Sequence, residues 1–236
     1  MLVFVVILLS LSYLTNALLH PARPESLQTP MNDVNLDDVR AILKDAEIIP
    51  TVLDDFDPSI TIQVSWGNAT AKLGNTISPS ELQDAPKIAL LSSQASISGG
   101  AQTAPSNIVL ALTDPDAPSR SNPKWSEMCH WIAANLTLPS SSFPAPGSDA
   151  NIHQGPGDDL VPYKPPGPPP KTGKHRYVFI AFKPANGTSS PLNLTAPSER
   201  QHWGTGKQEH GVRDWAGKNG LVPIGANFIY SQNAEQ

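Results

Sequence analysis

The pattern of hydrophobic and polar positions predicts a chain built mainly of strands. Residues 60–66 alternate apolar and polar side chains, which is typical of a strand with one face on a core. Short apolar runs bounded by turn-forming residues are typical of central strands. These runs cover residues 87–91, 108–112, 131–136 and 177–182, and a last strand is expected at 226–230.

Only two short helices are expected. Residues 36–44 place apolar side chains at 36, 39, 42 and 43, the spacing of an amphipathic helix. Residues 212–218 favour a second helix, which would end before Pro223. Because strands dominate, the predicted fold is mainly β: a two-sheet antiparallel Greek-key sandwich with short peripheral helices. Periodicity alone leaves an α+β layer open as the alternative.

The chain of 236 residues is expected to form a single domain over residues 31–236, since all-β folds of this size often have one core. Proline accounts for 25 residues, about double the ordinary usage of roughly 5%. Such a chain is rich in loops. Two stretches of Ser, Gly, Ala and Pro, at 92–107 and 139–161, are predicted to be mobile surface loops.

The first 17 residues are predicted to be a signal peptide, followed by a linker over residues 18–30. A membrane anchor is the alternative, but the apolar run is shorter than the roughly 18 residues that span a bilayer. Glycosylation triplets support the secretory route. They begin at Asn68, Asn135, Asn186 and Asn193. We therefore expect a secreted glycoprotein with no transmembrane span.

The charge of the chain and its single cysteine limit the partners and the disulfide bonds that it can be expected to have. The net charge is -5, from 16 basic and 21 acidic residues, and no basic run could neutralise a string of phosphates. Nucleic acid is therefore not an expected partner, and no motif predicts a cofactor. The lone Cys129 cannot form an intramolecular disulfide, so it is interpreted as a buried thiol, with pairing between chains as the alternative.

The first segment with candidate chemistry is Thr-Asp-Pro-Asp-Ala-Pro-Ser-Arg, residues 113–120, directly after a predicted strand. Its prolines stiffen the corner that holds Asp114 and Asp116. His130 opens the next apolar run, and an antiparallel return would bring it back near Asp114. The alternative is that both carboxylates only cap turns, as Asp often does beside Pro.

The second segment, residues 163–177, is rich in proline. Five prolines between 165 and 170 hold an extended backbone, and His175 stands where the next strand begins. A Pro-rich ligand for aromatic grooves is the alternative. It is less favoured, because such ligands are usually disordered and this segment runs directly into a buried strand.

Together the two segments resemble the signature regions of the phosphatidylethanolamine-binding family, over roughly residues 31–230. The resemblance implies a β-sandwich with a small surface cavity for phosphate-type anions or phospholipid headgroups, and no catalytic residues. It also implies a cis bond at Ala117-Pro118 that turns Asp114 toward His130. The cavity lining implied position by position is Asp114, Asp116, Ala117, Pro118, Trp125, His130, Pro168, Pro169, His175 and Tyr177.

This chain departs from the family pattern at the rim of the implied cavity. Pro165 stands where glycine is common, and Met128 and Cys129 stand where Trp or Tyr and a second His are common. The stretch at 139–161 is also longer than usual. These differences would change which ligand the cavity accepts.

Other functions remain open. Some members of the family inhibit a serine carboxypeptidase or a kinase, so inhibition of a serine carboxypeptidase or another partner is the first alternative, while a secreted location disfavours kinase regulation. An enzyme acting on phospholipid is the second. A hydrolase would need a nucleophile, but Gly-x-Ser-x-Gly is absent, and Cys129 and His130, as neighbours on a strand, point to opposite faces.

A metal site is a further competitor. His130, His175 and Asp114 could supply two imidazoles and a carboxylate, but no close-spaced ligand pair supports such a site, and no metal is predicted. His202 and His210 flank a Gly-Thr-Gly-Lys run that is too short for a phosphate loop, and they have no assigned role.

The implied cavity raises an electrostatic problem, because the Asp114 carboxylate should repel a phosphate. Proline has no N–H to donate, so the donors must be His130, His175 and nearby non-proline amides. A carboxylate beside an imidazole favours the charged ring. We therefore expect Asp114 to keep one imidazole protonated, and the affinity for a phosphomonoester to fall as the pH rises.

Overall fold

The computed structural model describes residues 35–92, 107–136 and 159–236. The predicted signal peptide, the linker at 18–30 and most of the two low-complexity stretches lie outside the described residues. In one place the second stretch reaches into them, because its last three residues form a short strand, β6 (Asp159–Val161), rather than a loop.

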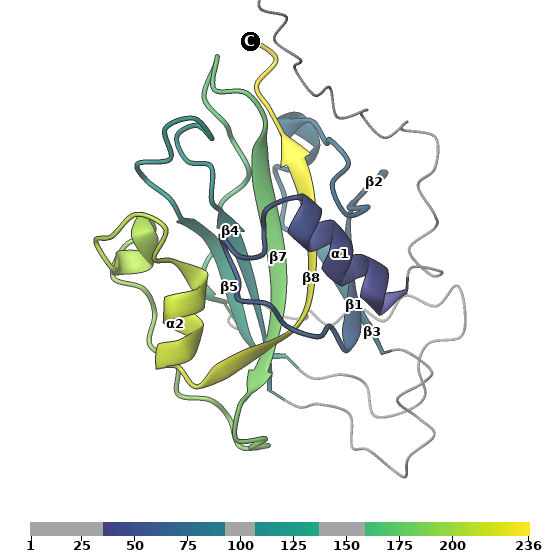
Figure 1. Ribbon diagram of the computed structural model, residues 1–236, viewed down its shortest axis with the longest axis vertical. Coiled ribbons are helices and arrows are strands. Elements are labelled where there is room, and N and C mark those ends of the chain that lie inside the picture. Colours follow the sequence, from purple (N-terminus) through teal and green to yellow (C-terminus); the bar gives the residue numbers. More distant parts are fainter. Residues whose placement is uncertain (1–34, 93–106, 137–158) are drawn as a thin grey trace, which may run out of the picture.

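The described residues contain eight strands, two α-helices and two short 3-10 turns (Figure 1). The strands are β1 (Ile60–Trp66), β2 (Ala69–Thr70), β3 (Lys87–Ser92), β4 (Ile108–Asp114), β5 (Met128–Leu136), β6 (Asp159–Val161), β7 (His175–Pro184) and β8 (Leu221–Ser231). The helices are α1 (Leu36–Asp45) and α2 (Val212–Lys218), and the 3-10 turns are η3 (Pro79–Glu81) and η5 (His202–Gly204).

The strands form two antiparallel sheets, in the orders β2-β1-β3 and β6-β5-β4-β7-β8. In the larger sheet β4, β5 and β6 are consecutive neighbours, and β7 returns to lie beside β4. That is the strand order of a Greek key. The predicted fold class, mainly β with two antiparallel sheets and short helices, is confirmed.

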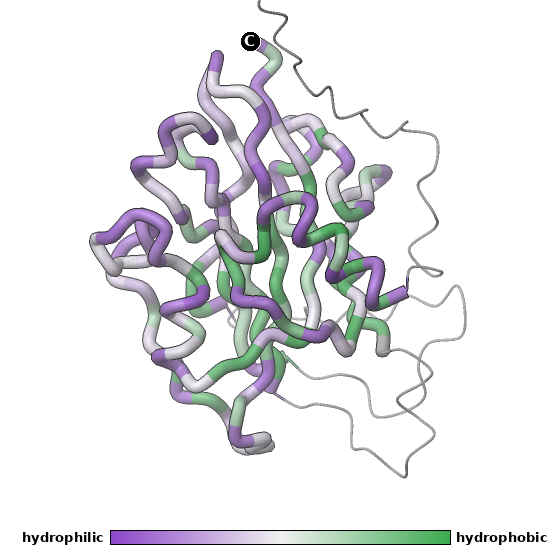
Figure 2. The backbone as a smooth tube through the Cα atoms, in the orientation of Figure 1, coloured by the Kyte–Doolittle hydropathy of each residue, from purple (hydrophilic) through white to green (hydrophobic). Residues whose placement is uncertain are grey.

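The alternation of side chains along β7 separates two cores. Tyr177, Phe179 and Ala181 pack in a cluster with β1 and β3, whereas Val178, Ile180 and Phe182 pack in a cluster with α1 and α2. The five-stranded sheet is therefore buried on both faces, between the helices and the smaller sheet. The hydrophobic positions lie along the strands in the middle of the molecule, and hydrophilic positions dominate the loops (Figure 2).

The predicted elements differ from the observed ones mainly at their ends. β5 begins at Met128, three residues earlier than expected, and β7 begins at His175. β8 begins at Leu221 and includes Pro223, which the sequence suggested would lie outside any strand. A register shift between Ala181 and Phe182 of β7 accommodates this proline, since prolines inside sheets occur at bulges.

A buried ion pair joins three elements. The Arg176 side chain donates two hydrogen bonds to Asp116, from Nη2 to Oδ1 at 2.6 Å and from Nε to Oδ2 at 2.9 Å. The Arg176 backbone amide also donates to Oδ2, at 2.7 Å. Arg176 Nη1 donates to the carbonyl oxygens of Ala46 and Glu47, each at 2.9 Å. This side chain therefore links the residues after β4 and the start of β7 to the carboxyl end of α1.

We predict that Asp116→Ala lowers the free energy of unfolding by about 3–5 kcal/mol, because it leaves the buried guanidinium without its counter-ion. Urea denaturation followed by fluorescence measures this change. Asp57→Ala is the matched control, since the Asp57 side chain also contacts an arginine, Arg40, but is 89% exposed. It should change stability by less than about 1 kcal/mol. Equal effects of the two substitutions would contradict the role given to the buried pair.

Candidate functional site

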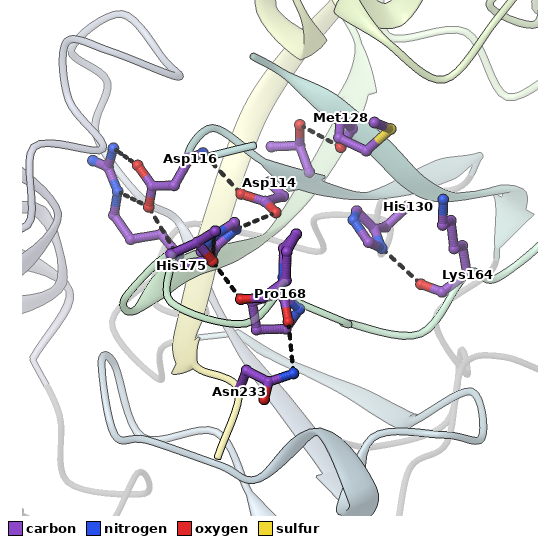
Figure 3. A network of polar contacts seen from close by, with 12 residues as sticks. Asp114, Asp116, Met128, His130, Lys164, Pro168, His175 and Asn233 are labelled. Carbon is purple, nitrogen blue, oxygen red and sulfur yellow. Dashed lines mark hydrogen bonds and ion pairs between the residues drawn. The ribbon is translucent and has the colours of Figure 1, made fainter. Parts of the chain in front are cut away.

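The candidate site lies at one end of the five-stranded sheet. β4 ends at Asp114, and its antiparallel neighbours β5 and β7 begin at Met128 and His175. The end of one strand and the starts of the other two therefore meet at the same edge. Figure 3 shows Asp114 beside His175, with His130 on the neighbouring strand and Pro168 below them. His175 and Tyr177 share the face of β7 that packs toward the smaller sheet.

Both oxygens of the Asp114 carboxylate accept hydrogen bonds, and the Tyr177 hydroxyl is also within hydrogen-bond reach of it. Its Oδ1 accepts a hydrogen bond from the Asp116 amide at 2.8 Å, and its Oδ2 accepts one from His175 Nδ1 at 2.9 Å. The predicted cis bond at Ala117-Pro118 is confirmed. The hydrogen bond of Asp114 goes to His175 rather than to His130, because β7 begins at this edge, although the charge of Asp114 also acts on His130.

His175 uses both ring nitrogens within the protein. Nδ1 donates to Asp114, and Nε2 lies 3.1 Å from the Thr172 hydroxyl oxygen. That hydroxyl also lies 2.7 Å from the Pro169 carbonyl, to which it can donate its hydrogen. Both ring nitrogens of His175 are therefore occupied by contacts within the protein.

His130 is the histidine with an open nitrogen. Its Nδ1 donates to the Lys164 carbonyl at 2.8 Å, and Nε2 has no hydrogen-bond partner among the described residues, although the residue is only 4% exposed. Burial lowers the pKa of His130 below its usual range, and the negative charge of Asp114 only partly opposes this. In the neutral ring Nδ1 keeps the hydrogen, so Nε2 presents a lone pair.

Tyr177 lies between the two histidines. Its ring meets the His130 ring edge-on, with the ring centroids 5.2 Å apart, and stacks on the His175 ring at 6.3 Å. Burial, and then the charge of Asp114, raise the pKa of the phenol, so its hydroxyl stays protonated and is a hydrogen-bond donor. The backbone of Gly167 is within hydrogen-bond reach of the same hydroxyl.

Gly167 is a candidate that the sequence interpretation missed. Between residues 165 and 170 it is the only residue that is not proline, so it has the only backbone N–H in this wall. That signal was present in the sequence. Asn233 was also missed: its side-chain amide donates to the Pro168 carbonyl at 3.3 Å, which ties the carboxyl-terminal segment to the wall (Figure 3).

The other residues implied by the family resemblance differ in their burial and in their contacts. Pro168 is buried next to the histidines, whereas Pro169 is exposed and contributes its carbonyl to Thr172. Ala117 is buried, Pro118 is half-buried, and the Ala117 carbonyl accepts a hydrogen bond from the amide of Trp125. The exposed Trp125 ring lies 5.3 Å from the Lys124 ammonium.

Asp116 differs from the other predicted lining residues. Its carboxylate faces Arg176, and the two side chains are buried together on the side of the sheet that carries the helices. Asp116 therefore holds the corner in place through its side chain and reaches the site only through its backbone amide, which binds Asp114.

The side chains of Asp114, His175 and Thr172 contact one another in the order of an acid, a base and a hydroxyl nucleophile. It differs from such a triad because the Thr172 hydroxyl also lies 2.7 Å from the Pro169 carbonyl, to which it can donate its hydrogen in place of the ring. The buried thiol predicted for Cys129 is confirmed, and burial raises its pKa to about 12. Neither group is an activated nucleophile.

No group of three or more His, Cys, Asp or Glu side chains in the described ranges could hold a metal ion. His210 pairs with Asp214 at the surface, and His202 binds the Lys124 carbonyl, so both histidines that were left unassigned make local contacts. None of the helices in residues 35–92, 107–136 and 159–236 is long and apolar enough to cross a membrane.

A buried carboxyl group beneath the site was also missed. Glu127 is 1% exposed, and its Oε2 accepts a hydrogen bond from the Thr113 hydroxyl at 3.0 Å, which in turn accepts one from Trp203 Nε1. Oε1 has no hydrogen-bond partner in the described part of the chain. Burial raises the pKa of Glu127 to about 8, so this group is a neutral acid at neutral pH.

Residues 58–229 match the family model described as phosphatidylethanolamine-binding protein. This match covers more than half of the chain, and the antiparallel sandwich agrees with it. The chain belongs to the phosphatidylethanolamine-binding protein family, and the resemblance drawn from its sequence is confirmed.

Among individual relatives, the chain is similar to the carboxypeptidase Y inhibitor of Saccharomyces cerevisiae, with 30% identity over 78% of this chain and 90% of that protein. It is 28% identical to the protein FLOWERING LOCUS T of Arabidopsis thaliana, over 68% of this chain and 76% of that protein.

Two solved structures share the fold. A carboxypeptidase Y inhibitor complexed with its cognate proteinase aligns with a TM-score of 0.69 and 27% identity, covering 84% of this chain and 96% of that one. A phosphatidylethanolamine-binding protein from Plasmodium vivax aligns with a TM-score of 0.63 and 20% identity, covering 83% of this chain and 97% of that one.

The burial of Glu127 predicts a pH dependence of stability. Because the pKa is about 8 in the folded chain and near 4.3 in an unfolded chain, the folded state binds the extra proton between these values. Its contribution is complete below the unfolded pKa and is lost as the pH rises toward 8, with a slope of roughly 1.4 kcal/mol per pH unit.

Glu127→Gln keeps the shape and removes the titration, so it should flatten the fall in the free energy of unfolding between pH 5 and pH 8. Denaturation curves at several pH values measure the slope for wild type and variant. Glu209→Gln, at an exposed position, is the matched control and should keep the wild-type slope. An unchanged slope in Glu127→Gln would show that Glu127 is not the group responsible.

Proposed function

We propose that this protein is a non-enzymatic binding module that holds a phosphate-type anion at the end of its five-stranded sheet. The observation that carries the proposal is Nε2 of His130, which has no hydrogen-bond partner among the described residues and lies beside the bonded pair of Asp114 and His175. This nitrogen is therefore free to bind a ligand. The Tyr177 hydroxyl, within hydrogen-bond reach of Asp114 and of the Gly167 backbone, borders the same site.

The contacts of Asp114 explain how an anion can bind next to it. Its carboxylate accepts hydrogen bonds from His175 Nδ1 at 2.9 Å and from the Asp116 amide at 2.8 Å. These donors offset part of its negative charge, so an incoming anion meets a hydrogen-bonded rather than an isolated carboxylate. The unactivated Thr172 hydroxyl and Cys129 thiol support a binding role over an enzyme acting on phospholipid.

We predict that His130→Ala weakens the binding of phosphoethanolamine by about tenfold or more, since a hydrogen bond to a charged group contributes roughly 1.5–3 kcal/mol. Isothermal titration calorimetry measures the affinity. His210→Ala, at an exposed histidine, is the control and should bind like wild type. In wild type the affinity should fall as the pH rises through the range of His130, because protonated His130 attracts the anion. Binding that is unchanged in His130→Ala would reject this site.

Inhibition of a serine carboxypeptidase is the second candidate function. The similarity to the carboxypeptidase Y inhibitor spans 90% of that protein, and the solved complex with its proteinase covers 84% of this chain.

We expect the purified protein to inhibit yeast carboxypeptidase Y and to elute with it as a stable complex in gel filtration. Peptide hydrolysis by the enzyme is followed at increasing inhibitor concentration. His130→Ala tests whether the anion site takes part, because inhibition that survives this substitution separates the two functions. Full enzyme activity at a large molar excess of the protein would reject the inhibitor hypothesis for this enzyme.

We also propose that the chain is exported, with removal of a signal peptide near residue 17. The four candidate glycosylation asparagines are exposed. Asn135 lies near the end of β5, and Asn186 and Asn193 follow β7, at the opposite end of the sheet from Asp114 and His175. Glycans at these three positions would leave the candidate site free.

Intact-mass measurement of the protein from its native source, before and after enzymatic removal of N-glycans, tests the export proposal. We expect a chain that starts near Leu18 and loses mass on deglycosylation. A chain that retains Met1 and carries no glycan would contradict it.

A further inference from the structure

The dipeptide Asn-Gly occurs twice in the sequence, at residues 186–187 and 219–220. In this dipeptide the backbone nitrogen of the glycine can attack the side-chain carbonyl carbon of the asparagine. Glycine favours this attack, because it has no side chain to shield its nitrogen or to restrict its backbone. Since the two dipeptides are identical, a difference in their reactivity must come from the structure around each.

The backbone around the two sites is closely matched. Both glycines have a left-handed backbone, with φ of 67° at Gly187 and 65° at Gly220. The Gly187 amide donates to the Pro184 carbonyl and the Gly220 amide to the Gly217 carbonyl, each at 3.1 Å. The two sites are also neighbours, since the Ala185 amide donates to the Gly220 carbonyl at 2.8 Å. The two attacking nitrogens are therefore held by equivalent contacts at the same end of the molecule.

The side chain of Asn186 is held toward its own glycine. Asn186 is exposed, and its Oδ1 accepts a hydrogen bond from the Thr188 amide at 3.1 Å, so the side chain is folded forward over the backbone of Gly187. This contact also places a donor on the oxygen that becomes negatively charged when the nitrogen attacks. Nδ2 of Asn186, the atom that must leave, has no hydrogen-bond partner among the described residues.

The side chain of Asn219 is held away from its glycine. Asn219 is half-buried at the carboxyl end of α2, and its Nδ2 donates to the Trp215 carbonyl at 2.9 Å, four residues earlier in the chain. Its Oδ1 accepts a hydrogen bond from the Thr195 amide, also at 2.9 Å. Both contacts must break before the side chain can turn toward the nitrogen of Gly220.

We propose that Asn186 is a site of spontaneous modification, at which the Gly187 nitrogen displaces the side-chain amide and closes a cyclic imide, whereas Asn219 is protected by the fold. A bond forms between the Gly187 nitrogen and Asn186 Cγ, and the bond from Cγ to Nδ2 breaks. The hydrogen of the Gly187 nitrogen leaves with Nδ2 as ammonia. Water then opens the imide at either of its carbonyls, which gives aspartate or isoaspartate. This modification does not depend on the proposed anion-binding function.

The modification removes the amide that a glycan would use. Asn186 is the first residue of an Asn-Gly-Thr triplet, in which a glycan is attached to Nδ2. A chain that carries a glycan at Asn186 therefore keeps its amide. A chain without the glycan gains a negative charge beside the contact between Ala185 and Gly220, and it can no longer be glycosylated at this position.

Peptide mapping of the full chain, produced in bacteria so that it carries no glycan, tests the proposal. The folded protein is incubated at mildly alkaline pH, where the attacking nitrogen loses its hydrogen more readily, and mass spectrometry follows the conversion of each asparagine. We expect Asn186 to convert at least about tenfold faster than Asn219, the factor that two ordinary hydrogen bonds give. Both aspartate and isoaspartate should form at Asn186, since direct hydrolysis of the side chain would give aspartate alone.

The matched control is the same protein in concentrated urea, where the contacts that hold Asn219 are lost. There the two asparagines should convert at closely similar rates, because glycine follows each of them. Conversion of Asn219 as fast as Asn186 in the folded protein, or no conversion of Asn186 there, would overturn the proposal. Aspartate without isoaspartate at Asn186 would also overturn it, as would a difference between the two sites that persists in urea.

Discussion

Two consecutive residues at the start of β7 hold the corner that follows β4. His175 binds Asp114 on the face toward the smaller sheet, and Arg176 binds Asp116 on the face toward the helices. Because adjacent residues of a strand point to opposite faces, the start of β7 binds one carboxylate of the Asp-Pro-Asp sequence on each face of the sheet. The position of α1 depends on the same contact, since Arg176 also binds the carbonyls that follow this helix.

The division of labour between the two carboxylates explains the character of the site. Asp116 stabilises the fold through Arg176, and Asp114 is bonded to His175. What remains open at this edge is Nε2 of His130, whose pKa is lowered by burial, flanked by a phenol that keeps its hydrogen. Such a site offers individual hydrogen-bonding groups rather than a concentration of positive charge.

Many of the strands and helices could be predicted from the sequence, because the spacing of apolar residues that marks them is a local pattern. The alternation over residues 60–66 and the apolar run at 177–182 mark strands, and the spacing at 36–44 marks the first helix. The starts of β5 and β8 could not be found in this way, because Met128 pairs with Asp114 and Pro223 with Phe182 through backbone contacts that hydropathy does not record.

The partners inside the site were harder to predict than its members. The sequence placed Asp114, His130 and His175 together, but which histidine meets the carboxylate depends on strand order, and β7 lies on one side of β4 with β5 on the other. The burial of Glu127 likewise results from Thr113 and Trp203, which are distant from it in the chain or on another strand. These are tertiary contacts, and no local pattern contains them.

The central claim is that His175 is closed on both sides and His130 is open at Nε2. Nitrogen-15 NMR of the histidine side chains in the ligand-free protein at neutral pH measures this directly. The account predicts that His175 carries a hydrogen at Nδ1, bonded to Asp114, and that His130 carries one only at Nδ1. A bare Nδ1 on His175, or a hydrogen on Nε2 of His130, would contradict it.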